Sequence, residues 1–130
     1  MPGRKSPTFT EVELEFMQIL WEYGAQTTGD IQEKLRSQDR DLADGSIRKI
    51  LQILMRKGHL TRIKSGRGFV YEAKTVRAQA ENKMISDLLE RAFSGSIPDM
   101  VATLLNSSKF DAEDLETIKK LIRKHENRGK

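Results

Sequence analysis

The sequence predicts a mainly α-helical fold with one small β-hairpin. Three apolar stripes of helical period come first, followed by two β-prone segments around a glycine-rich turn and then by three more helical stripes. A chain of 130 residues suffices for one small domain with a core and an additional helical arm. We expect residues 1–8 to be a flexible tail, residues 9–74 to form the first domain and residues 75–130 to form the arm.

The first two helices are predicted from their capping signals. Thr10 and Glu13 have the spacing of a capping box, an apolar stripe follows them, and Gly24 is a typical stop signal. The same capping spacing recurs at Thr27, so we expect a short second helix over residues 27–36. The polar segment that follows is expected to be a connection.

The third helix is expected to run from Asp44 to Lys57, with Gly58 as its stop signal. Its apolar positions are spaced to share one face and comprise Ile47, Ile50, Leu51 and Leu54. The opposite face is basic and amide-bearing, and it carries Gly45, Lys49, Gln52 and Arg56, with Arg48 on one flank. This face has no acid after Asp44, whereas a helix face that serves only solubility usually mixes both signs of charge.

A basic hairpin is predicted directly after the third helix. Residues 59–64 and 69–74 are rich in residues that favour β-strands. Between them lies Ser65-Gly66-Arg67-Gly68, a glycine-rich turn that carries one arginine. The sequence therefore predicts two short strands with a positively charged tip.

Positive charge is concentrated in the third helix and the hairpin. The whole chain carries a formal net charge of +4. Between Asp44 and Arg67 the only acid is Asp44, and the seven cations are Arg48, Lys49, Arg56, Lys57, Arg62, Lys64 and Arg67. This segment therefore carries +6 and the rest of the chain −2, a distribution typical of a nucleic-acid-binding surface.

Three helices followed by a two-stranded hairpin is the element order of a winged helix-turn-helix domain. In such domains the third helix enters the major groove of DNA, and the hairpin contacts the flanking backbone or the minor groove. Lysine and arginine neutralise phosphates, while glutamine and arginine form paired hydrogen bonds to purine edges. Gly45 lets the start of the third helix, with its free N–H groups, come close to DNA. We therefore predict a double-stranded DNA partner, contacted by Gly45, Ser46, Arg48, Lys49, Gln52, Arg56, Lys64 and Arg67.

The arm is predicted to form a homodimer. Thr75 is expected to cap a long fourth helix that ends at Gly95, and Ser96 and Asp111 are expected to start two further helices. These apolar stripes are too extensive for the first domain to cover, and so short an arm cannot easily form a private core. A second copy would bury them and would place two third helices one or two DNA turns apart on a palindromic operator. The predicted dimer contacts are Ile85, Leu88, Leu89, Phe93, Met100, Val101, Leu104, Leu105, Leu115, Ile118 and Ile122.

The composition disfavours several other functions. The chain has no cysteine and two histidines, so disulfides, thiolate or histidine-rich metal sites and a bound cofactor are not expected. It has no apolar run long enough to span a bilayer and no signal-peptide pattern, so we expect no membrane partner and a cytoplasmic location. An enzyme is not expected, because nucleophile motifs, phosphate-binding glycine loops and plausible paired carboxylates are lacking. The alternative that stays open is a winged-helix protein–protein interaction module without DNA readout.

The residues resemble those of one bacterial family, the penicillinase repressors of the BlaI and MecI group. The resemblance covers nearly the whole chain, from about Phe9 to Ile122. Its most specific segments are Thr10–Trp21 in the first helix, Ser46–Leu51 in the third, Leu54–Leu60 leading into Phe69–Tyr71, and Ala92–Ser96 at the start of the family's dimerisation segment.

The resemblance implies a homodimeric transcriptional repressor on a palindromic operator near a promoter, with Ser46, Arg48 and Lys49 at positions that contact DNA. It also implies a regulatory protease as a partner, because well-known members are inactivated by a cut in their C-terminal helices. The matching stretch here lies near Thr103-Leu104, and the asparagine–phenylalanine pair cut in staphylococcal members is absent. Gly45 stands where the family often has lysine. The C-terminal cysteine cluster of the related copper-responsive repressors is also absent, which excludes copper sensing by that route.

Overall fold

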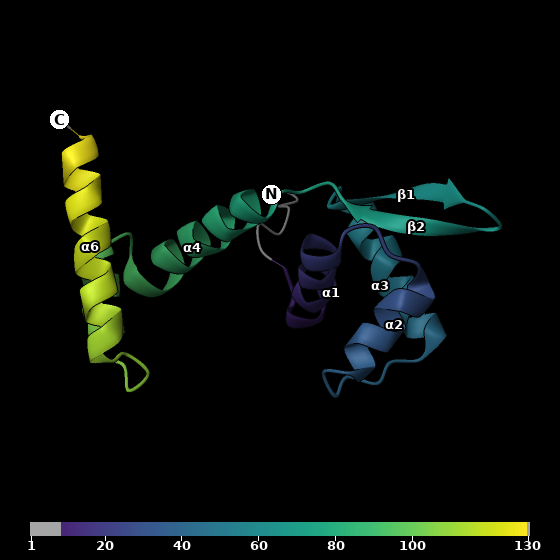
Figure 1. The fold of residues 1–130 in the computed structure, drawn as a ribbon, viewed down its shortest axis with the longest axis horizontal. Coiled ribbons are helices and arrows are strands. Elements are labelled where there is room, and N and C mark those ends of the chain that lie inside the picture. Colours follow the sequence, from purple (N-terminus) through teal and green to yellow (C-terminus); the bar gives the residue numbers. More distant parts are fainter. Residues whose placement is uncertain (1–8, 130) are drawn as a thin grey trace. The chain divides into compact units, whose positions relative to one another are not determined.

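The computed structural model describes residues 9–129, so the tail expected at residues 1–8 lies outside the described part. The chain divides into two compact units, and the boundary along the sequence falls within the fourth helix, between Asp87 and Leu88. Its elements (Figure 1) are α1 (Glu11–Tyr23), α2 (Thr28–Arg36), α3 (Asp44–Arg56), β1 (Leu60–Ser65), β2 (Gly68–Ala73), α4 (Arg77–Phe93), α5 (Ile97–Leu105) and α6 (Ala112–Arg128). This order confirms the mainly α-helical fold with one small hairpin.

The capping signals of the first unit produce the expected helices. Thr10 Oγ1 accepts a hydrogen bond from the Glu13 N–H at 3.1 Å, and the Glu13 carboxylate accepts one from the Thr10 N–H. Thr27 and Asp30 form the same reciprocal pair at the start of α2. α3 differs, because its N-cap is Ala43 and no side chain caps it. Its first turn therefore presents N–H groups without a side-chain acceptor at the N-cap.

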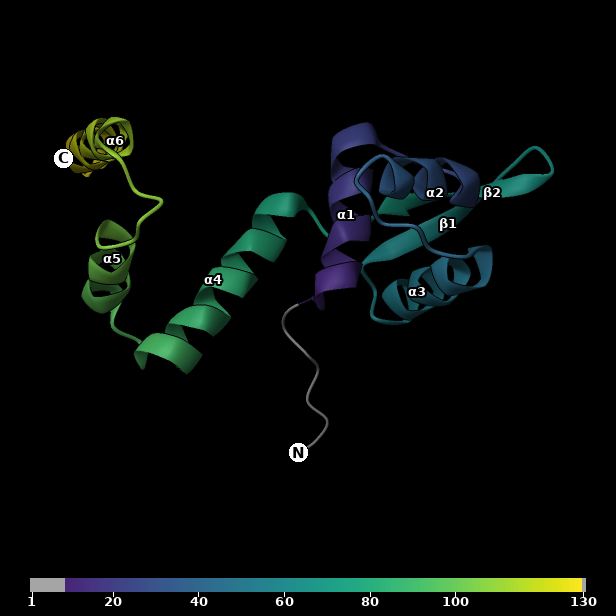
Figure 2. The same cartoon turned by 90° about the horizontal axis from the view of Figure 1, so that it is seen from below.

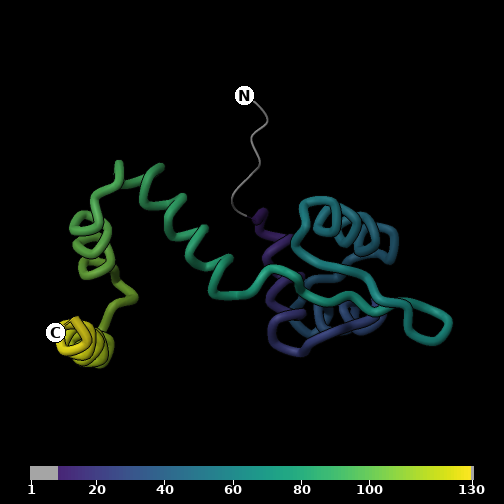
Figure 3. Tube along the Cα trace, turned by 90° about the horizontal axis from the view of Figure 1, so that it is seen from above, coloured from purple at the N-terminus to yellow at the C-terminus, as the bar shows by residue number. Residues whose placement is uncertain are grey.

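The two strands form an antiparallel hairpin whose outermost pair is Ser65 with Gly68. Gly66 and Arg67 lie between them, and Gly66 has a φ of 61° whereas the φ of Arg67 is not positive. This pattern is that of a type II′ turn, in which glycine at the first central position avoids a clash of Cβ with the backbone. The turn carries Arg67 at the tip of the hairpin, which extends past the neighbouring helices in Figure 3.

One apolar core joins the first three helices to the base of the hairpin. Figure 1 shows α1, α2 and α3 on one side of the hairpin, and Figure 2 shows the same helices from below. Ile50, expected in this core, is only partly buried and packs against its edge. The buried members are Phe16, Met17, Ile19, Leu20, Ile31, Leu35, Ile47, Leu51, Leu54, Leu60 and Tyr71.

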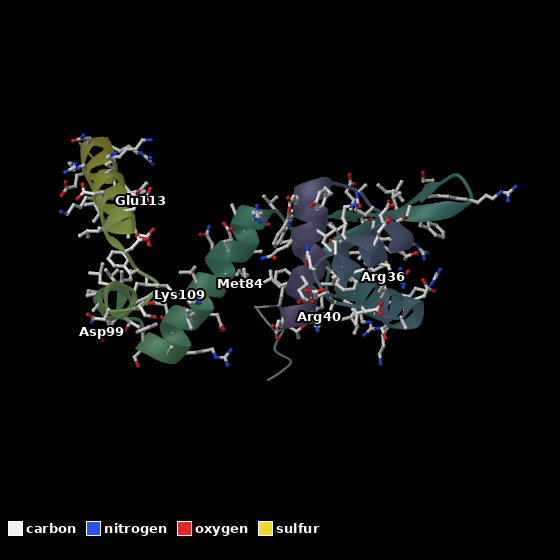
Figure 4. All side chains as sticks on the ribbon, turned by 60° about the horizontal axis from the view of Figure 1, so that its bottom comes forward. Arg36, Arg40, Met84, Asp99, Lys109 and Glu113 are labelled. Carbon is white, nitrogen blue, oxygen red and sulfur yellow. The ribbon has the colours of Figure 1, made fainter. Side chains whose placement is uncertain are left out.

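Two polar anchors hold the connections of the first unit. The Gln26 N–H donates to the Tyr71 carbonyl at 3.0 Å, and the Tyr71 N–H donates back to the Gln26 carbonyl at 2.7 Å. This short bridge ties the turn between α1 and α2 to strand β2. Arg40, labelled in Figure 4, donates two hydrogen bonds to the Glu15 carboxylate at 2.9 and 2.7 Å. The connection between α2 and α3 is thereby held against α1.

The start of the fourth helix differs from the expected one. α4 begins at Arg77, so the prediction that Thr75 caps it is wrong. Thr75 has tertiary partners instead: its hydroxyl lies 2.9 Å from His59 Nδ1, and its carbonyl accepts a hydrogen bond from Trp21 Nε1 at 2.8 Å. The Thr75 hydroxyl therefore pairs with the ring of His59, which is distant in sequence, instead of accepting from an N–H at the start of α4.

The second unit contains the end of α4, followed by α5 and α6. Ser96 caps α5 and Asp111 caps α6, as their spacing predicts. No residue between Leu88 and Gly129 is buried, so this unit has no core of its own in the single chain. None of the helices in residues 9–129 is both long and apolar enough to cross a membrane.

Candidate nucleic-acid interface

The polar face of α3 points to solvent, as its sequence predicts. Ile47, Leu51 and Leu54 on the opposite side are fully buried in the core. Because these three positions fix the rotation of the helix, its other side is turned outward. All the predicted contact residues of this helix are exposed, namely Gly45, Ser46, Arg48, Lys49, Gln52 and Arg56.

The C-terminal end of α3 is fixed to α1 by an ion pair. Lys57 Nζ lies 3.1 and 3.0 Å from the two carboxylate oxygens of Glu13. The Glu13 side chain is 8% exposed and the Lys57 side chain 33% exposed, so the pair is largely shielded from water. Lys57 is one of the seven cations of this segment, but its charge is balanced by Glu13 and adds little to the basic surface.

Arg48 is partly neutralised by a residue of its own helix. Its Nε donates a hydrogen bond to Asp44 Oδ2 at 2.8 Å, across one helical turn. This hydrogen bond and the attraction of the carboxylate raise the pKa of the Arg48 guanidinium. Both side chains are more than half exposed, and such surface pairs are weak. An anionic ligand can therefore replace Asp44 as the partner of Arg48.

The hairpin carries cations on the face that turns toward the helices. The strand register places Arg62 opposite Tyr71 and Lys64 opposite Phe69 on this face. Tyr71 belongs to the core at the base of the hairpin, so the same face continues outward to Phe69 and Lys64. The Arg62 guanidinium lies 4.0 Å from the centre of the Phe69 ring, a cation–π contact that orders the arginine.

A hollow of about 390 Å³ lies where α2, α3 and the hairpin meet. Arg48 of α3 and Arg67 of the hairpin tip both line it, so the fold brings together two predicted contacts from different elements. The remaining lining residues are Thr27, Thr28, Ser65, Gly68, Phe69 and Tyr71. Two guanidinium groups, three hydroxyls of threonine and serine and no acid in the lining make this hollow suited to an anion such as phosphate.

Sequence reasoning did not include Thr27 and Thr28 among the contact residues. Thr28 is the first residue of α2, so the N-terminus of that helix lies beside the same hollow, with the Asp30 N–H already bonded to Thr27 Oγ1. The capping signal at Thr27 located this helix start in the sequence. The same signal does not show that this helix start lies next to the hairpin tip, because that position depends on the Gln26–Tyr71 bridge.

The other predicted contacts do not line the hollow. They comprise Gly45, Ser46, Lys49, Gln52 and Arg56 on α3 and Lys64 on β1. Gly45 adopts no unusual φ, and a Cβ added there would meet no atom within 4 Å. The chain itself therefore does not require glycine at position 45.

The predicted dimer contacts are poorly covered in the single chain. Leu104 is 58% exposed, and Leu89, Phe93, Met100 and Ile118 are half-buried. The Thr103-Leu104 bond lies within α5, and both residues are exposed. The other exposed members of the predicted set are Ile85, Leu88, Val101, Leu105, Leu115 and Ile122.

Comparisons of sequence connect the chain to one family. The family model described as penicillinase repressor matches residues 9–124. A penicillinase repressor of Bacillus licheniformis is 26% identical over 127 residues, which cover 98% of each chain. The methicillin resistance regulatory protein MecI of Staphylococcus aureus strain Mu50 is 21% identical over 120 residues, which cover 92% of this chain and 97% of MecI.

Comparisons of structure agree with the fold. The solution structure of the DNA-binding domain of the repressor BlaI aligns with 59% of this chain and 93% of that one, at 28% identity and a TM-score of 0.50. The apo form of MarR from E. coli aligns with 89% of this chain and 77% of its own, at 18% identity and a TM-score of 0.53. These likenesses confirm the predicted winged-helix fold.

Proposed function

The chain belongs to the penicillinase repressor family, and on that premise we propose that it represses transcription by binding a palindromic DNA operator as a homodimer. The main support for DNA binding is that Arg48 and Arg67, which belong to α3 and to the hairpin, line the same hollow. These are the two elements that contact DNA in winged helix-turn-helix domains. BlaI, whose DNA-binding domain has a similar fold, is described as a repressor, which supports the same role here.

In this proposal α3 lies in the major groove and reads bases. Lys49, Gln52 and Arg56 project from its exposed face, and neither Lys49 nor Arg56 forms an ion pair with an acid in the described part of the chain. Lysine and arginine can bind guanine edges, and glutamine can form two hydrogen bonds with adenine. Ser46 and Gly45 at the start of α3 are close to the uncapped N–H groups of its first turn, which suit a phosphate.

The hollow beside α3 is proposed to hold the DNA backbone. A phosphate there would meet Arg48 and Arg67 on two sides and the start of α2 at Thr28. Arg48 would exchange its carboxylate partner Asp44 for the phosphate. Contacts of this kind set the position of the domain on the duplex, while the base contacts of α3 set the sequence preference.

The DNA part can be tested with alanine variants on a selected site. Sequences bound from a random DNA pool define the site, and gel-shift titrations then measure affinity at several salt concentrations. We expect Lys49→Ala, which removes a proposed base contact, to weaken binding by about 1–3 kcal/mol. Arg67→Ala, which removes a proposed phosphate contact, should weaken binding to all sequences by a similar factor. A lost phosphate contact should also flatten the slope of log K against log salt by about one unit.

Matched controls separate this surface from net charge. Arg36→Ala and Lys109→Ala each remove one positive charge from a residue that does not line the hollow, at the C-terminal end of α2 and after α5 (both labelled in Figure 4). Both controls should bind the selected site like the wild type. Unchanged affinity of both Lys49→Ala and Arg67→Ala would refute the proposed surface, and absence of any salt-dependent binding would favour a protein–protein module instead.

The homodimer part rests on the apolar surface of the second unit. α5 and α6 are regular, capped helices, yet no residue between Leu88 and Gly129 is buried. Leu104 and Ile122 are each more than half exposed. Large apolar side chains that stay exposed on several capped helices mark an interaction site, and a second copy with two-fold symmetry is the simplest partner. A regulatory protease that cut at Thr103-Leu104 would remove α6 and so weaken this dimer.

The dimer part can be tested by light scattering after size-exclusion chromatography. Leu104→Glu should raise the dimer dissociation constant by at least about 100-fold, because it places a carboxylate in an apolar interface. Leu104→Met keeps the apolar volume and should leave the dimer intact. A monomeric wild type, or a Leu104→Glu variant that dimerises like the wild type, would contradict the proposed interface.

A further inference from the structure

A second cavity lies in the first unit, away from the proposed DNA surface. Its volume is about 220 Å³, and its lining comes from the segment before α1, the residue before β1, the connection between β2 and α4, and α4 itself. Cavities for drug-sized ligands measure about 300–1,000 Å³, so this one fits a smaller molecule. The lining residues are Phe9, His59, Thr75, Gln79, Ala80 and Lys83. Met84, the neighbour of Lys83 in α4, is labelled in Figure 4.

The lining has an apolar part and a part with hydrogen-bond donors. The Phe9 ring and the Ala80 methyl group supply the apolar part, and the Phe9 ring centre lies 4.4 Å from that of His59. The Lys83 ammonium and the Gln79 amide supply donors from adjacent turns of α4. A molecule with a short apolar body and one polar end matches this division.

His59 and Thr75 make one wall of the cavity rigid. His59 Nδ1 lies 2.9 Å from the Thr75 hydroxyl, so Nε2 is the ring nitrogen that takes no part in this contact. The Thr75 carbonyl accepts a hydrogen bond from Trp21 Nε1, and the Thr75 N–H donates to the His59 carbonyl at 3.1 Å. A preorganised wall lowers the conformational cost of binding a ligand.

Lys83 carries the one formal charge in the lining of the cavity, and the lining contains no acid. In residues 9–129 no ion pair joins Lys83 to a carboxylate, and residues 1–8 contain no acid. Burial lowers the pKa of His59, and the positive charges of Lys57 and Lys83 lower it further, while Glu13 opposes them. Glu13 is already bound to Lys57. An anion beside Lys83 would therefore supply a counter-charge that the lining of the cavity lacks.

We propose that this cavity binds a small organic carboxylate, with the carboxylate on Lys83 and Gln79 and the apolar body between Phe9 and Ala80. Such a ligand would contact α4 and the His59–Thr75 wall at the same time. It would therefore fasten the segment that leads from the hairpin into α4. This proposal does not depend on DNA binding, because every lining residue lies outside the DNA surface.

Benzoate is a suitable probe, because it joins a carboxylate to a compact apolar ring, and benzamide is its neutral counterpart. The experiment uses the full chain without DNA, at constant ionic strength, and follows the His59 ring resonances by NMR. We expect millimolar benzoate to shift the His59 ring resonances saturably. Benzamide should shift them much less. The Lys83→Met variant should bind benzoate at least about 10-fold more weakly, a difference of about 1.4 kcal/mol.

Lys74→Met is the matched control, because it removes the same charge from an exposed residue that does not line the cavity. It should change the benzoate affinity by less than about 2-fold, as expected for an exposed charge outside the site. The proposal is overturned if benzoate gives no saturable shift of His59, if benzamide binds equally well, or if Lys83→Met binds benzoate like the wild type. None of these outcomes bears on the gel-shift test of the DNA surface.

Discussion

The two units of the chain differ in how their apolar stripes are covered. In the unit that ends at Asp87, α1, α2 and α3 meet one another and the base of the hairpin, and Phe16, Leu35 and Leu51 are fully buried. In the unit that begins at Leu88, the helices are capped equally well, yet no described residue is buried. A regular amphipathic helix therefore does not create a core unless the same chain supplies a surface that faces it.

This difference separates two sources of stability. The first unit carries its own buried apolar surface, so its free energy of unfolding should be a property of the single chain. The second unit gains burial only through the proposed second copy, so its stability should rise with protein concentration. Trp21 is the single tryptophan and lies in α1, so its fluorescence reports the first unit, whereas α5 and α6 contribute to far-ultraviolet circular dichroism.

The largest effect is expected from a matched pair of leucine truncations. Leu51→Ala removes a fully buried side chain and should lower the free energy of unfolding of the first unit by about 2–5 kcal/mol at every protein concentration. Leu104→Ala removes a side chain that is 58% exposed in the single chain, so its effect should appear in the dimer and depend on concentration. Denaturant titrations with both optical signals, at low and high protein concentration, measure the difference.

The same titrations can show that the two units do not differ in how their stability arises. If the fluorescence midpoint of the wild type rises with protein concentration as much as the dichroism midpoint does, the first unit also depends on the second copy. If Leu104→Ala lowers stability equally at both concentrations, α5 is covered within one chain. Either result would remove the distinction between an intrinsic core and an assembled one.

A smaller effect is expected at the ion pair that fixes the end of α3. Glu13→Gln keeps a side chain able to accept the Thr10 N–H but loses the charge that binds Lys57. We expect a loss of about 1–2 kcal/mol, below the range for fully buried pairs, because Lys57 can turn toward water. Lys57→Met should cost more, because Glu13 would then hold a shielded negative charge without a cationic partner.

Fluorescence-monitored denaturation of the two variants checks this order. Both changes should leave the dissociation constant of the dimer unaltered, since Glu13 and Lys57 lie in the first unit. Equal stability of the wild type and Lys57→Met would show that the pair does not stabilise the contact between α1 and α3.

The sequence predicted most of the first unit because its signals are local. The capping spacings at Thr10 and Thr27 and the stripe of α3 act within a few residues, and the structure confirms them. The prediction for Thr75 was wrong because the partners of that residue, His59 and Trp21, come from distant parts of the chain. Local spacing cannot anticipate a competing tertiary hydrogen bond.

The candidate DNA surface was predictable in part for the same reason. The exposed cations of α3 follow from helical period, and Arg67 follows from the glycine-rich turn. The neutralisation of Lys57 and the position of Thr28 beside the hairpin tip were not predictable, because Glu13 and Tyr71 are far away in sequence. Charge counted along a segment thus overstates the charge that its surface presents.

The smallest effect is expected at Gly45, and it joins the fold to the proposed DNA surface. Gly45→Ala should raise the stability of the first unit by about 0.5–1 kcal/mol, because alanine loses less chain entropy in a helix and its Cβ meets no atom within 4 Å. The same change at Gly58, where φ is 85°, should destabilise the unit and serves as the matched control. If the backbone at Gly45 approaches DNA closely, Gly45→Ala will weaken operator binding in gel-shift titrations while it stabilises the fold. Full retention of affinity in the stabilised variant would place the DNA farther from the start of α3 than the proposed surface requires.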